Sequence, residues 1–408
     1  MKILLLTQYF PPETGAPQNR LFEMAVRFQQ KGAEISVLTA MPNYPQMQVY
    51  EGYKRKIYVY EEMNDLKVYR SWIYASKNKS VVSRLLNYFS FVKSSFWIGW
   101  FKLGKFDYVI CESPPLFLGI SAYLLSKLKG ARLIFNVSDL WPESAEKLGL
   151  VKNKLMLNSA TKLEEFLYRK SHLISGQTQG IVKNIATRFP TKKVYWLPNG
   201  ADLNYYKENT NDVNTWREEN SFLNDDFILL YAGVIGYAQG LEVILKAADR
   251  LKEHPEIKFV LVGSGPEKEY LENLKKTLNV TNVIFIDTVA KKEMVRIIAA
   301  ANAAVIPLKK LELFKGAIPS KIFENLAMKK PILLGVEGEA KELFIDEGKC
   351  GLSYTPEDEA DLANKVLQLY TEKEQTYKLG ENGYNYVKQK FNRSEIIDGF
   401  WNAINYQS

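Results

Sequence analysis

Short runs of aliphatic and β-branched residues alternate with amphipathic segments along almost the whole chain. KILLLTQYF, DYVIC and ARLIFNV are runs of the first half, and FILLYAG and KPILLGV of the second. The segments between them, such as PQNRLFEMAVRFQQKG, carry apolar residues at helical spacing. Because strands that alternate with helices are joined by crossover connections, this pattern predicts a doubly wound α/β architecture with parallel sheets.

The alternation starts afresh near residue 200, which indicates two lobes. At 408 residues the chain is too long for one compact core. The polar, Asn-rich stretch from Pro198 to Trp216 is the expected hinge. We therefore expect a first Rossmann-like domain over residues 1–200, a second over 201–385, and a helical segment over 386–408 that packs back toward the first.

Net charge is divided unevenly between these halves. The chain carries +8, but residues 1–200 hold 28 Lys and Arg against 14 Asp and Glu, a net +14, which leaves −6 for the remainder. The split favours an anionic surface or ligand facing the first domain. Ordinary drift of charge between domains would also produce it.

Residues 66–106 sharpen this expectation, because they include eight Lys and Arg and no carboxylate. The same stretch has an apolar stripe at helical spacing, formed by Leu85, Phe89, Val92, Phe96, Trp100 and Leu103. Aromatic rings and cations at this density are typical of a helix that lies on a membrane surface. A core helix would explain the stripe but not the missing acids, so we expect contact with the inner face of the cell membrane.

Several residue types are too scarce for some chemistries. The chain has two histidines, His172 and His254, and no Asp-x-Asp, so we expect no metal site and no nucleophile triad. Cys111 and Cys350 lie far apart in apolar runs, as buried thiols of a reducing compartment do. No run is long enough to span a bilayer and Met1 leads directly into a strand, so we expect a cytoplasmic protein, peripheral at the membrane.

Two glycine-rich loops follow predicted strands of the second half. One contains Gly236, and the other contains Gly263 and Gly265. Ligands of parallel sheets bind at the carboxyl ends of strands, where glycine lets the backbone approach a phosphate and helix N-termini attract it. Such turns are also common as purely structural features, but two of them in one lobe favour a phosphate site.

The segment from Lys315 to Met328 is the most specific of the chain. Ser320 is placed to cap a short helix, and Glu324 lies one turn from its start. A carboxylate there can accept two hydrogen bonds from a ribose diol, and Lys321 can meet a diphosphate. The ordinary alternative for Glu324 is a solvated or capping side chain.

The first half offers two loops of the same kind. Gly15 lies in PPETGAP after the first strand, where either a phosphate loop or a proline-rich entry into a helix fits. Asp139 and Glu143 belong to DLWPE, which follows the buried strand LIFNV and so lies at the carboxyl end of a strand. Trp141 fits either a platform that stacks on a sugar ring or a core aromatic.

The order of KILLLTQYFPPETGAPQNR, DLWPE, WLPNG, YAGVIG, LVGSGP and PSKIFENLAMKKPIL resembles glycosyltransferase family 4 over nearly the whole chain. The resemblance implies the GT-B architecture, two Rossmann-like domains with a cleft between them, and a retaining sugar transfer without metal. Members with the DLWPE and PSK elements assemble bacterial capsule, exopolysaccharide or O-antigen units. It further implies a UDP-sugar as co-substrate with no other cofactor, an N-acetylated amino sugar as the group moved, and a polyprenyl-diphosphate-linked saccharide as acceptor.

The same resemblance assigns roles to the residues above. Asp139 and Glu143 would orient the sugar and the acceptor, and Lys321 would neutralise the leaving diphosphate. The nucleotide-sugar donor would be held by Gly15, Gly236, Gly263, Gly265, Gly316, Ala317, Ser320, Lys321 and Glu324.

Two departures from the family pattern weaken parts of this assignment. Of two glutamates that the family often carries eight positions apart, Glu324 matches the second, whereas Gly316 stands at the first. Backbone groups of Gly316 and Ala317 are expected to serve instead. The loop at Gly236 also lacks the Arg and Lys of many members, which leaves Lys321 as the main cation for the diphosphate.

Other functions remain open. A non-transferring nucleotide-sugar epimerase shares the fold and needs neither an acceptor nor a membrane. A protein that binds nucleic acid or membranes through its basic half would leave the second lobe unexplained, and the chain has no recognisable nucleic-acid module, so we expect no nucleic-acid partner. A dehydrogenase is not expected, because GSGP is not the full G-x-G-x-x-G that opens a helix.

Overall fold

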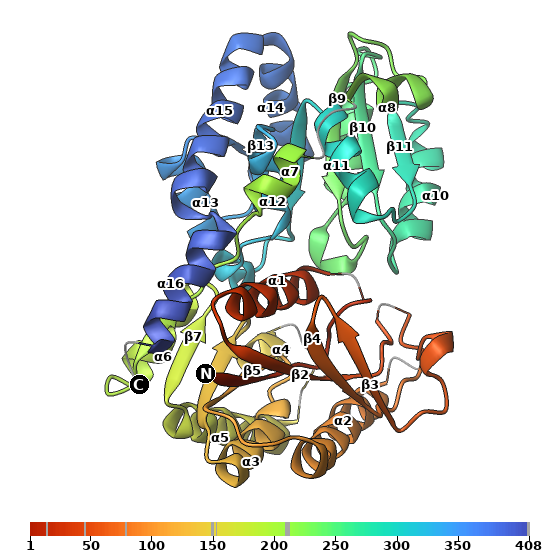
Figure 1. Cartoon of the computed structure of the whole chain (residues 1–408). Helices are drawn as coiled ribbons and strands as arrows, with labels where there is room; N and C mark the ends of the chain where they lie inside the picture. Colours follow the sequence, from red (N-terminus) through yellow and green to blue (C-terminus); the bar gives the residue numbers. More distant parts are fainter. Residues whose placement is uncertain are drawn as a thin grey trace. The chain divides into compact units, whose positions relative to one another are not determined.

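The computed structural model describes residues 1–13, 15–44, 46–77, 80–147, 151, 153–208 and 213–405. The chain divides into two compact units, coloured along the sequence in Figure 1. Unit 1 consists of Met1–Pro198 and Ile397–Ser408, and unit 2 of Asn199–Ile396. The chain therefore passes from one unit to the other twice, and each unit has its own sheet and its own core.

In its described residues, unit 1 is built around an eight-stranded sheet of order β3-β4-β2-β1-β5-β6-β7-β8, parallel except for the β3–β4 pair. Its strands are β1 (Lys2–Leu6), β2 (Glu34–Ala40), β3 (Tyr58–Met63), β4 (Leu66–Ser71), β5 (Tyr108–Ser113), β6 (Arg132–Val137), β7 (Leu173–Gly176) and β8 (Val194–Trp196). Its helices are α1 (Ala16–Gln30), α2 (Val81–Lys102), α3 (Leu118–Lys129), α4 (Glu143–Lys147), α5 (Lys154–Lys170) and α6 (Gln179–Arg188), with η1 (Glu51–Tyr53) as a 3₁₀ turn. Figure 1 shows α2, α3 and α5 on one face of the sheet and α1 on the other, which is the two-sided cover of a doubly wound fold.

The described part of unit 2 has a six-stranded, fully parallel sheet of order β11-β10-β9-β12-β13-β14. Its strands are β9 (Phe227–Ala232), β10 (Ile257–Val262), β11 (Val283–Ile286), β12 (Ala303–Pro307), β13 (Ile332–Gly335) and β14 (Gly351–Ser353). Its helices are α7 (Leu203–Glu208), α8 (Val213–Glu219), α9 (Glu242–Arg250), α10 (Lys268–Leu278), α11 (Lys291–Ala300), α12 (Lys321–Ala327), α13 (Glu339–Lys341), the π-helical η4 (Glu342–Glu347), α14 (Glu359–Thr371) and α15 (Lys373–Lys390). Two 3₁₀ turns, η2 (Tyr237–Gln239) and η3 (Glu312–Gly316), follow β9 and β12.

The predicted pair of doubly wound, Rossmann-like domains is confirmed. Strands covered on both faces are nearly continuous apolar runs, and Ile3, Leu4 and Leu5 of β1 are each almost fully buried. The strand order reverses once in each sheet, between β1 and β5 in unit 1 and between β9 and β12 in unit 2. Open parallel sheets bind ligands beside such a reversal, at the carboxyl ends of the strands.

The antiparallel edge strand β3 is absent from the sequence-based prediction. It pairs with β4 through a two-residue turn, in which Asn64 and Asp65 have φ values of 48° and 61°. Asn and Asp tolerate the left-handed conformation that a tight hairpin requires. Glu61 and Glu62 in β3 hide the apolar pattern, because an edge strand need not be buried on both faces.

The two passages between the units lie side by side within unit 2. Ala201 N donates to Phe391 O at 3.0 Å, and Arg393 N donates to Ala201 O at 3.0 Å. A Cβ on Gly200 would overlap the carbonyl oxygen of Phe391, so this close approach requires glycine. The segment expected to act as a hinge therefore begins in a paired, closely packed backbone.

The last helix, α16 (Arg393–Asn405), begins in unit 2 and from Ile397 onward belongs to unit 1. Its Asp398 pairs with Arg27 of α1 at 2.5 Å. Its Phe400 and Trp401 rings lie 6.2 and 5.1 Å from the ring of Phe28. Residues from the end of the chain thus complete the core of the first unit.

Candidate functional site

Two loops at the carboxyl ends of β9 and β10 touch through their backbones. Ile235 N donates to Ser264 O at 2.9 Å. A Cβ on Gly263 would overlap the carbonyl oxygen of Gly233, and one on Gly265 that of Ile235, so both positions require glycine. The contact brings two of the predicted glycine loops together at one edge of the sheet.

The ammonium group of Lys321 lies against this pair of loops. Its Nζ is 3.8 Å from the centre of the Tyr231 ring and 3.0 Å from the point that a Cβ on Gly233 would occupy. Loss of water around the ammonium lowers the pKa of Lys321 from 10.5 to about 7, and the carboxylate of Glu324 partly opposes this effect. The ring face compensates for part of the lost hydration. Near pH 7 Lys321 is therefore only partly charged, and an anion bound nearby would favour its charged form.

Helix α12 carries Lys321 and the predicted ribose ligand. Glu324 lies in its first turn and is half-buried. Ser320 occupies the predicted N-cap position, but its side chain makes no capping hydrogen bond. Ser320 is itself in helical conformation, and the amides of Ile322 and Phe323 bond to the backbone carbonyls of Pro319 and Ser320 instead.

Gly316 and Ala317 lie at the end of η3. A Cβ on Gly316 would meet nothing within 4 Å, so open space adjoins this residue. Ala317 N donates to Phe314 O at 3.0 Å and closes the turn. The amide of Ala317 is therefore engaged within the protein, which leaves Gly316 as the position expected to replace the missing glutamate.

Lys309 supplies a positive charge beside the loop at Gly236, which has none of its own. Lys309 N donates to Ala238 O at 3.0 Å, and its Nζ lies 3.3 Å from the centre of the exposed Tyr237 ring. Gly240, with φ 58°, allows the approach. The sequence analysis missed Lys309, although its place just after the apolar run AAVIPL marks the end of a strand.

In unit 1, Gly15 directly precedes α1, after the turn that follows β1. Its φ of 165° is extended, so the backbone there does not demand glycine. The turn is held by Glu13, whose buried carboxylate accepts hydrogen bonds from the amides of Asn43 and Tyr44 at 2.7 and 2.8 Å. Burial raises the pKa of Glu13, and these hydrogen bonds oppose the rise. Glu13 thus ties the turn after β1 to the segment after β2.

Asp139 and Glu143 lie beyond β6, as predicted, but in different surroundings. Asp139 Oδ2 accepts a hydrogen bond from Ser144 Oγ at 2.7 Å. Burial raises the pKa of Asp139, the bond from Ser144 opposes the rise, and the charge of Glu143 adds to it. Glu143 pairs with Lys147 at 2.7 Å on the surface of α4. Of the two carboxylates, Asp139 is the more firmly oriented.

A buried polar network, missed by the sequence analysis, lies just before Asp139 at the ends of β5 and β6. Arg20 of α1 pairs with Glu112 at 2.5 Å and also donates to Ser138 Oγ at 2.9 Å. Ser138 donates to Glu112 at 2.5 Å, and Asn136 donates to the other carboxylate oxygen. The network ties α1 to the strand that leads into Asp139. A carboxylate at the end of the apolar run YVIC was its signal in the sequence.

The choice left open for Trp141 is answered by its packing. The indole is half-buried, and its ring centre lies 5.2 Å from that of Phe117 in an edge-on arrangement. It packs against the buried core of unit 1. Trp141 therefore has the contacts of a core aromatic.

Helix α2 presents an apolar face to solvent. Its exposed hydrophobic side chains are Val82, Leu86, Phe89, Trp97, Trp100 and Phe101. Its buried side is mixed, with the apolar Phe91 and Val92 beside the polar Ser83, Asn87 and Ser95. The predicted stripe is wrong in part, because Val92 and Leu103 belong to the buried side.

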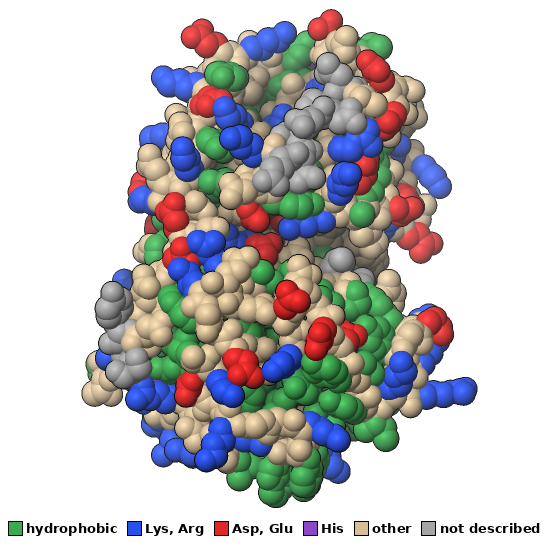
Figure 2. Space-filling model, viewed as in Figure 1, with side chains coloured by type: hydrophobic (Ala, Val, Ile, Leu, Met, Phe, Trp, Pro, Cys, Tyr) green, Lys and Arg blue, Asp and Glu red, His purple; other side chains and the backbone are tan. Residues whose placement is uncertain are grey.

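The exposed rings of α2 form a continuous cluster. The ring of Trp97 stacks on those of Trp100 and Phe101 at 5.4 and 5.7 Å between centres. Figure 2 shows hydrophobic side chains gathered over the part of unit 1 where Figure 1 places α2 and α3. Asn78 and Lys79 of the acid-free stretch lie outside the described residues. Among the helices that the structure describes, none is long and apolar enough to cross a membrane.

Solved structures share the whole fold. HepE of Anabaena in complex with UDP and glucose superposes with a TM-score of 0.72 over 100% of both chains, at 16% identity. WaaG, a glycosyltransferase involved in lipopolysaccharide biosynthesis, gives 0.67 over 98% of both chains, at 18% identity. Sucrose-phosphate synthase of Thermosynechococcus elongatus gives 0.76 over 99% of this chain and 98% of its own, at 15% identity. The two units thus have the fold of GT-B glycosyltransferases.

Sequence comparison identifies the family. Residues 15–200 match the model of the glycosyl transferase 4-like domain, and residues 212–386 match that of glycosyl transferases group 1. Over 334 residues the chain is 30% identical to WcaI of Escherichia coli K12, a glycosyl transferase assigned to colanic acid biosynthesis, covering 80% of this chain and 81% of WcaI. It is 21% identical to O-antigen chain mannosyltransferase C of Escherichia coli, covering 62% and 66%. The chain belongs to the family 4-like glycosyltransferases.

Proposed function

We propose that this glycosyltransferase moves an N-acetylated amino sugar from a UDP-sugar to a polyprenyl-diphosphate-linked saccharide, with retention at the anomeric carbon. The reaction would belong to the assembly of a bacterial surface polysaccharide. The observation that supports this proposal is the position of Lys321. Its ammonium group lies against the paired glycine loops, and Glu324 follows one turn further along α12. The UDP and glucose bound to HepE and the biosynthetic assignment of WcaI support the same donor class and pathway class.

The donor side of the reaction is assigned to unit 2. A diphosphate beside the loops of Gly236, Gly263 and Gly265 would restore the full charge of Lys321, which then stabilises the negative charge on the departing UDP. Lys309 would add a second cation. Glu324 would accept the two ribose hydroxyls.

The acceptor side is assigned to unit 1. Asp139 is oriented by Ser144, and the strand before it is fixed by the pair of Arg20 and Glu112. A carboxylate held in this way can align a sugar hydroxyl for attack on the anomeric carbon. Gly15 would approach the donor phosphate with its backbone.

The proposal is tested by a donor panel with a defined acceptor. UDP-, GDP- and ADP-sugars, including UDP-N-acetylated amino sugars, are incubated with polyprenyl-diphosphate-linked saccharide, and products are identified by mass spectrometry. We expect one UDP-sugar to extend the acceptor by one residue, with UDP released in equal amount. Release of nucleotide at the same rate without acceptor would instead favour the epimerase, and a GDP-sugar as best donor would overturn the UDP assignment.

We also propose that the exposed apolar face of α2 holds the enzyme at the inner face of the cell membrane, where its lipid-linked acceptor lies. Basic residues near an anionic surface gain about 1 kcal/mol each, and buried rings add a part that salt does not screen. In sedimentation with anionic vesicles we expect binding that falls with salt and falls further in Trp100→Glu. Tyr377→Glu, which places the same charge on a more exposed ring of unit 2, serves as the control. A parent protein that ignores anionic vesicles at low salt would remove the membrane from the proposal.

A further inference from the structure

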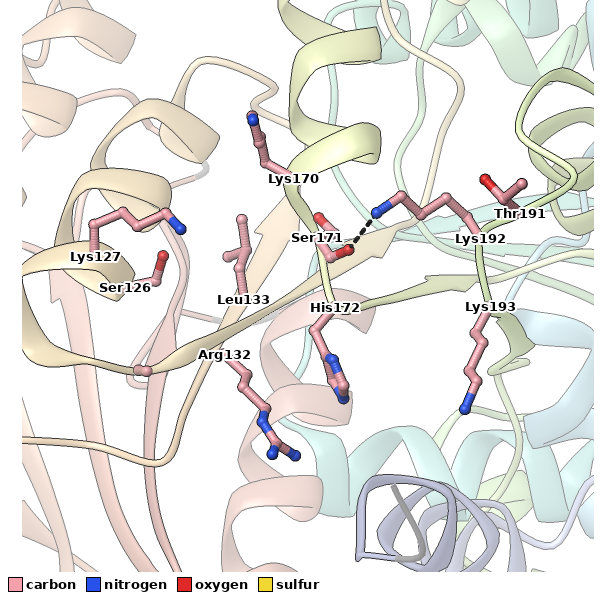
Figure 3. Close-up of a pocket in the computed structure, with 11 residues that line it drawn as sticks. Ser126, Lys127, Arg132, Leu133, Lys170, Ser171, His172, Thr191, Lys192 and Lys193 are labelled. Atoms are coloured by element: carbon pink, nitrogen blue, oxygen red, sulfur yellow. Dashed lines mark hydrogen bonds between the residues drawn. The ribbon is translucent and has the colours of Figure 1, made fainter. Parts of the chain in front are cut away.

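A basic cavity opens in unit 1 at the amino-terminal ends of β6, β7 and β8. It has a volume of about 490 Å³, and Figure 3 shows the side chains around it. Its charged and titratable lining residues are Lys127, Arg132, Lys170, His172, Lys192 and Lys193. Among the described residues that line it there is no carboxylate.

The cations that line this cavity come from three connections, those before β6, β7 and β8. In Figure 3, Lys127 of α3 and Lys192 of the loop before β8 point toward Ser171 from opposite sides, and Lys192 Nζ donates to Ser171 O at 3.0 Å. Arg132, His172 and Lys193 point to one side together. Several like charges around one cavity, with no acid among its described lining residues, make a site of positive potential.

The positive charges around the cavity affect the titration of His172. Its buried Nε2 has no hydrogen-bond partner among the described residues. Its pKa is lowered by burial first and then by the charges of Arg132, Lys193 and Lys192. Arg132 donates a hydrogen bond to the Tyr108 hydroxyl at 3.3 Å, and that hydroxyl donates to the carbonyl of Ile404 at 3.3 Å. An anion in the cavity would offset the repulsion that these positive charges exert on a protonated His172.

The cavity is separate from the transfer site. Gly15 and Asp139 lie beyond the carboxyl ends of β1 and β6, whereas the cavity lies at the opposite edge of the same sheet. A six-residue strand such as β6 spans about 20 Å. The donor and the acceptor hydroxyl therefore do not account for these cations.

The cavity instead shares helix α3 with exposed apolar side chains, and α3 contacts the end of α2. Lys129, the last residue of α3, donates to the carbonyls of Trp100 and Leu103 at 2.8 and 2.5 Å, which joins α3 to the end of α2. Leu124 and Leu128 of α3 are exposed on either side of the lining residue Lys127. Apolar side chains and a basic cavity thus occur on the same turns of the same helix.

We propose that this cavity binds the phosphodiester headgroup of an anionic phospholipid while the apolar side chains of α2 and α3 enter the acyl boundary. The inference rests on the proposed membrane association, and it adds a defined headgroup site to it. A phosphodiester carries one negative charge and accepting oxygens, which suit Arg and Lys donors and a histidine N–H. A soluble phosphate ester has the same chemistry, so the experiment separates the two sources.

The two histidines provide a direct test by NMR of protein with ¹³C-labelled histidine rings. His172 is the reporter, and His254, in unit 2, is the internal control. The probes are dihexanoyl phosphatidylglycerol below its micellar concentration, dihexanoyl phosphatidylcholine and inorganic phosphate. We expect the phosphatidylglycerol to shift the His172 signals and raise the pKa of His172, with His254 unmoved. A shift with inorganic phosphate but not with phosphatidylglycerol would overturn the lipid assignment, and equal shifts at both histidines would overturn the site.

Vesicle flotation then measures the contribution of the cavity. Arg132→Gln with Lys193→Gln should weaken binding to phosphatidylglycerol vesicles by about 30-fold, from two cations near the surface. Arg55→Gln with Lys56→Gln removes the same two residue types from an exposed loop and should weaken it less than threefold. Equal losses in both double variants would mean diffuse attraction and refute the cavity. Unchanged UDP binding in both keeps this result distinct from failure of the transferase proposal.

Discussion

The enclosed ammonium of Lys321 makes nucleotide binding depend on pH in a way that can be measured. A pKa lowered from 10.5 to about 7 corresponds to about 5 kcal/mol between the charged and neutral forms. The unfolded chain therefore holds more protons than the folded protein between these two values, and this residue makes stability rise with pH across that window. Below pH 7 Lys321 is charged in both the folded and the unfolded state, and its burial then lowers the stability of the fold by the full amount.

A bound diphosphate would favour the charged form of Lys321 and raise its pKa, so binding should take up a proton. At pH 8 about one tenth of Lys321 is charged in the free protein, and binding of a UDP-sugar should take up close to one proton. At pH 6 about nine tenths is already charged, and the uptake should be about one tenth of a proton. The ligand adds nothing of its own, because both phosphates of a UDP-sugar are esterified and do not titrate here.

Calorimetry in buffers of different ionisation enthalpy gives the number of protons directly. Lys321→Met should abolish the uptake at pH 8 and weaken binding. Lys330→Met is the matched control, since Lys330 is also enclosed, with its pKa lowered to about 8, but its Nζ donates to Ala299 O at 2.7 Å. Tight binding by the parent without proton uptake at pH 8, or the same uptake in Lys321→Met, would refute the role of Lys321.

Three further outcomes follow from the described contacts. Glu324→Gln weakens the bonds to the ribose and should remove about 1.5–3 kcal/mol of UDP affinity, measured by calorimetry; an unchanged affinity would end the ribose assignment. Turnover should survive excess EDTA, and a loss restored by magnesium would overturn charge neutralisation by protein side chains. Glu112→Gln removes the carboxylate charge that faces the buried Arg20 and should lower the free energy of unfolding in urea by about 3 kcal/mol. The exposed pair of Arg169 supplies the control, because Glu165→Gln should lower it by less than about 1 kcal/mol.

The fold was predictable because its strands are buried on both faces. Burial of that kind forces continuous apolar runs such as β1 and β9, and these are visible without any structure. The edge strand β3 escaped prediction for the opposite reason, since Glu62 is exposed and Glu61 pairs with the buried Arg70. The six exposed apolar side chains of α2 were located only in part, because helical periodicity gives a stripe without saying which stripe faces solvent.

Candidate site residues could be chosen from the sequence where a glycine follows a strand-like run, as at Gly263, or a charge begins a helix, as at Lys321. The enclosure of Lys321 was not, because its ring partner Tyr231 lies on another element, ninety residues earlier in the chain. The same holds for Arg20 and Glu112, which only the tertiary fold brings together. The sequence thus indicates candidate residues more readily than the partners that the fold places beside them.

Because part of α16 belongs to unit 1, the core of unit 1 cannot be completed until α16 has been synthesised. Phe28 and Tyr195 of unit 1 pack against Phe400, which the ribosome adds only after all of unit 2. Unit 2 is continuous in sequence and can close as soon as it is made, whereas unit 1 waits for its last aromatic contacts. At 5–20 residues per second, roughly two hundred intervening residues correspond to about 10–40 s. During that interval the nascent first unit exposes the rings that α16 later covers, which makes it a natural client for a chaperone.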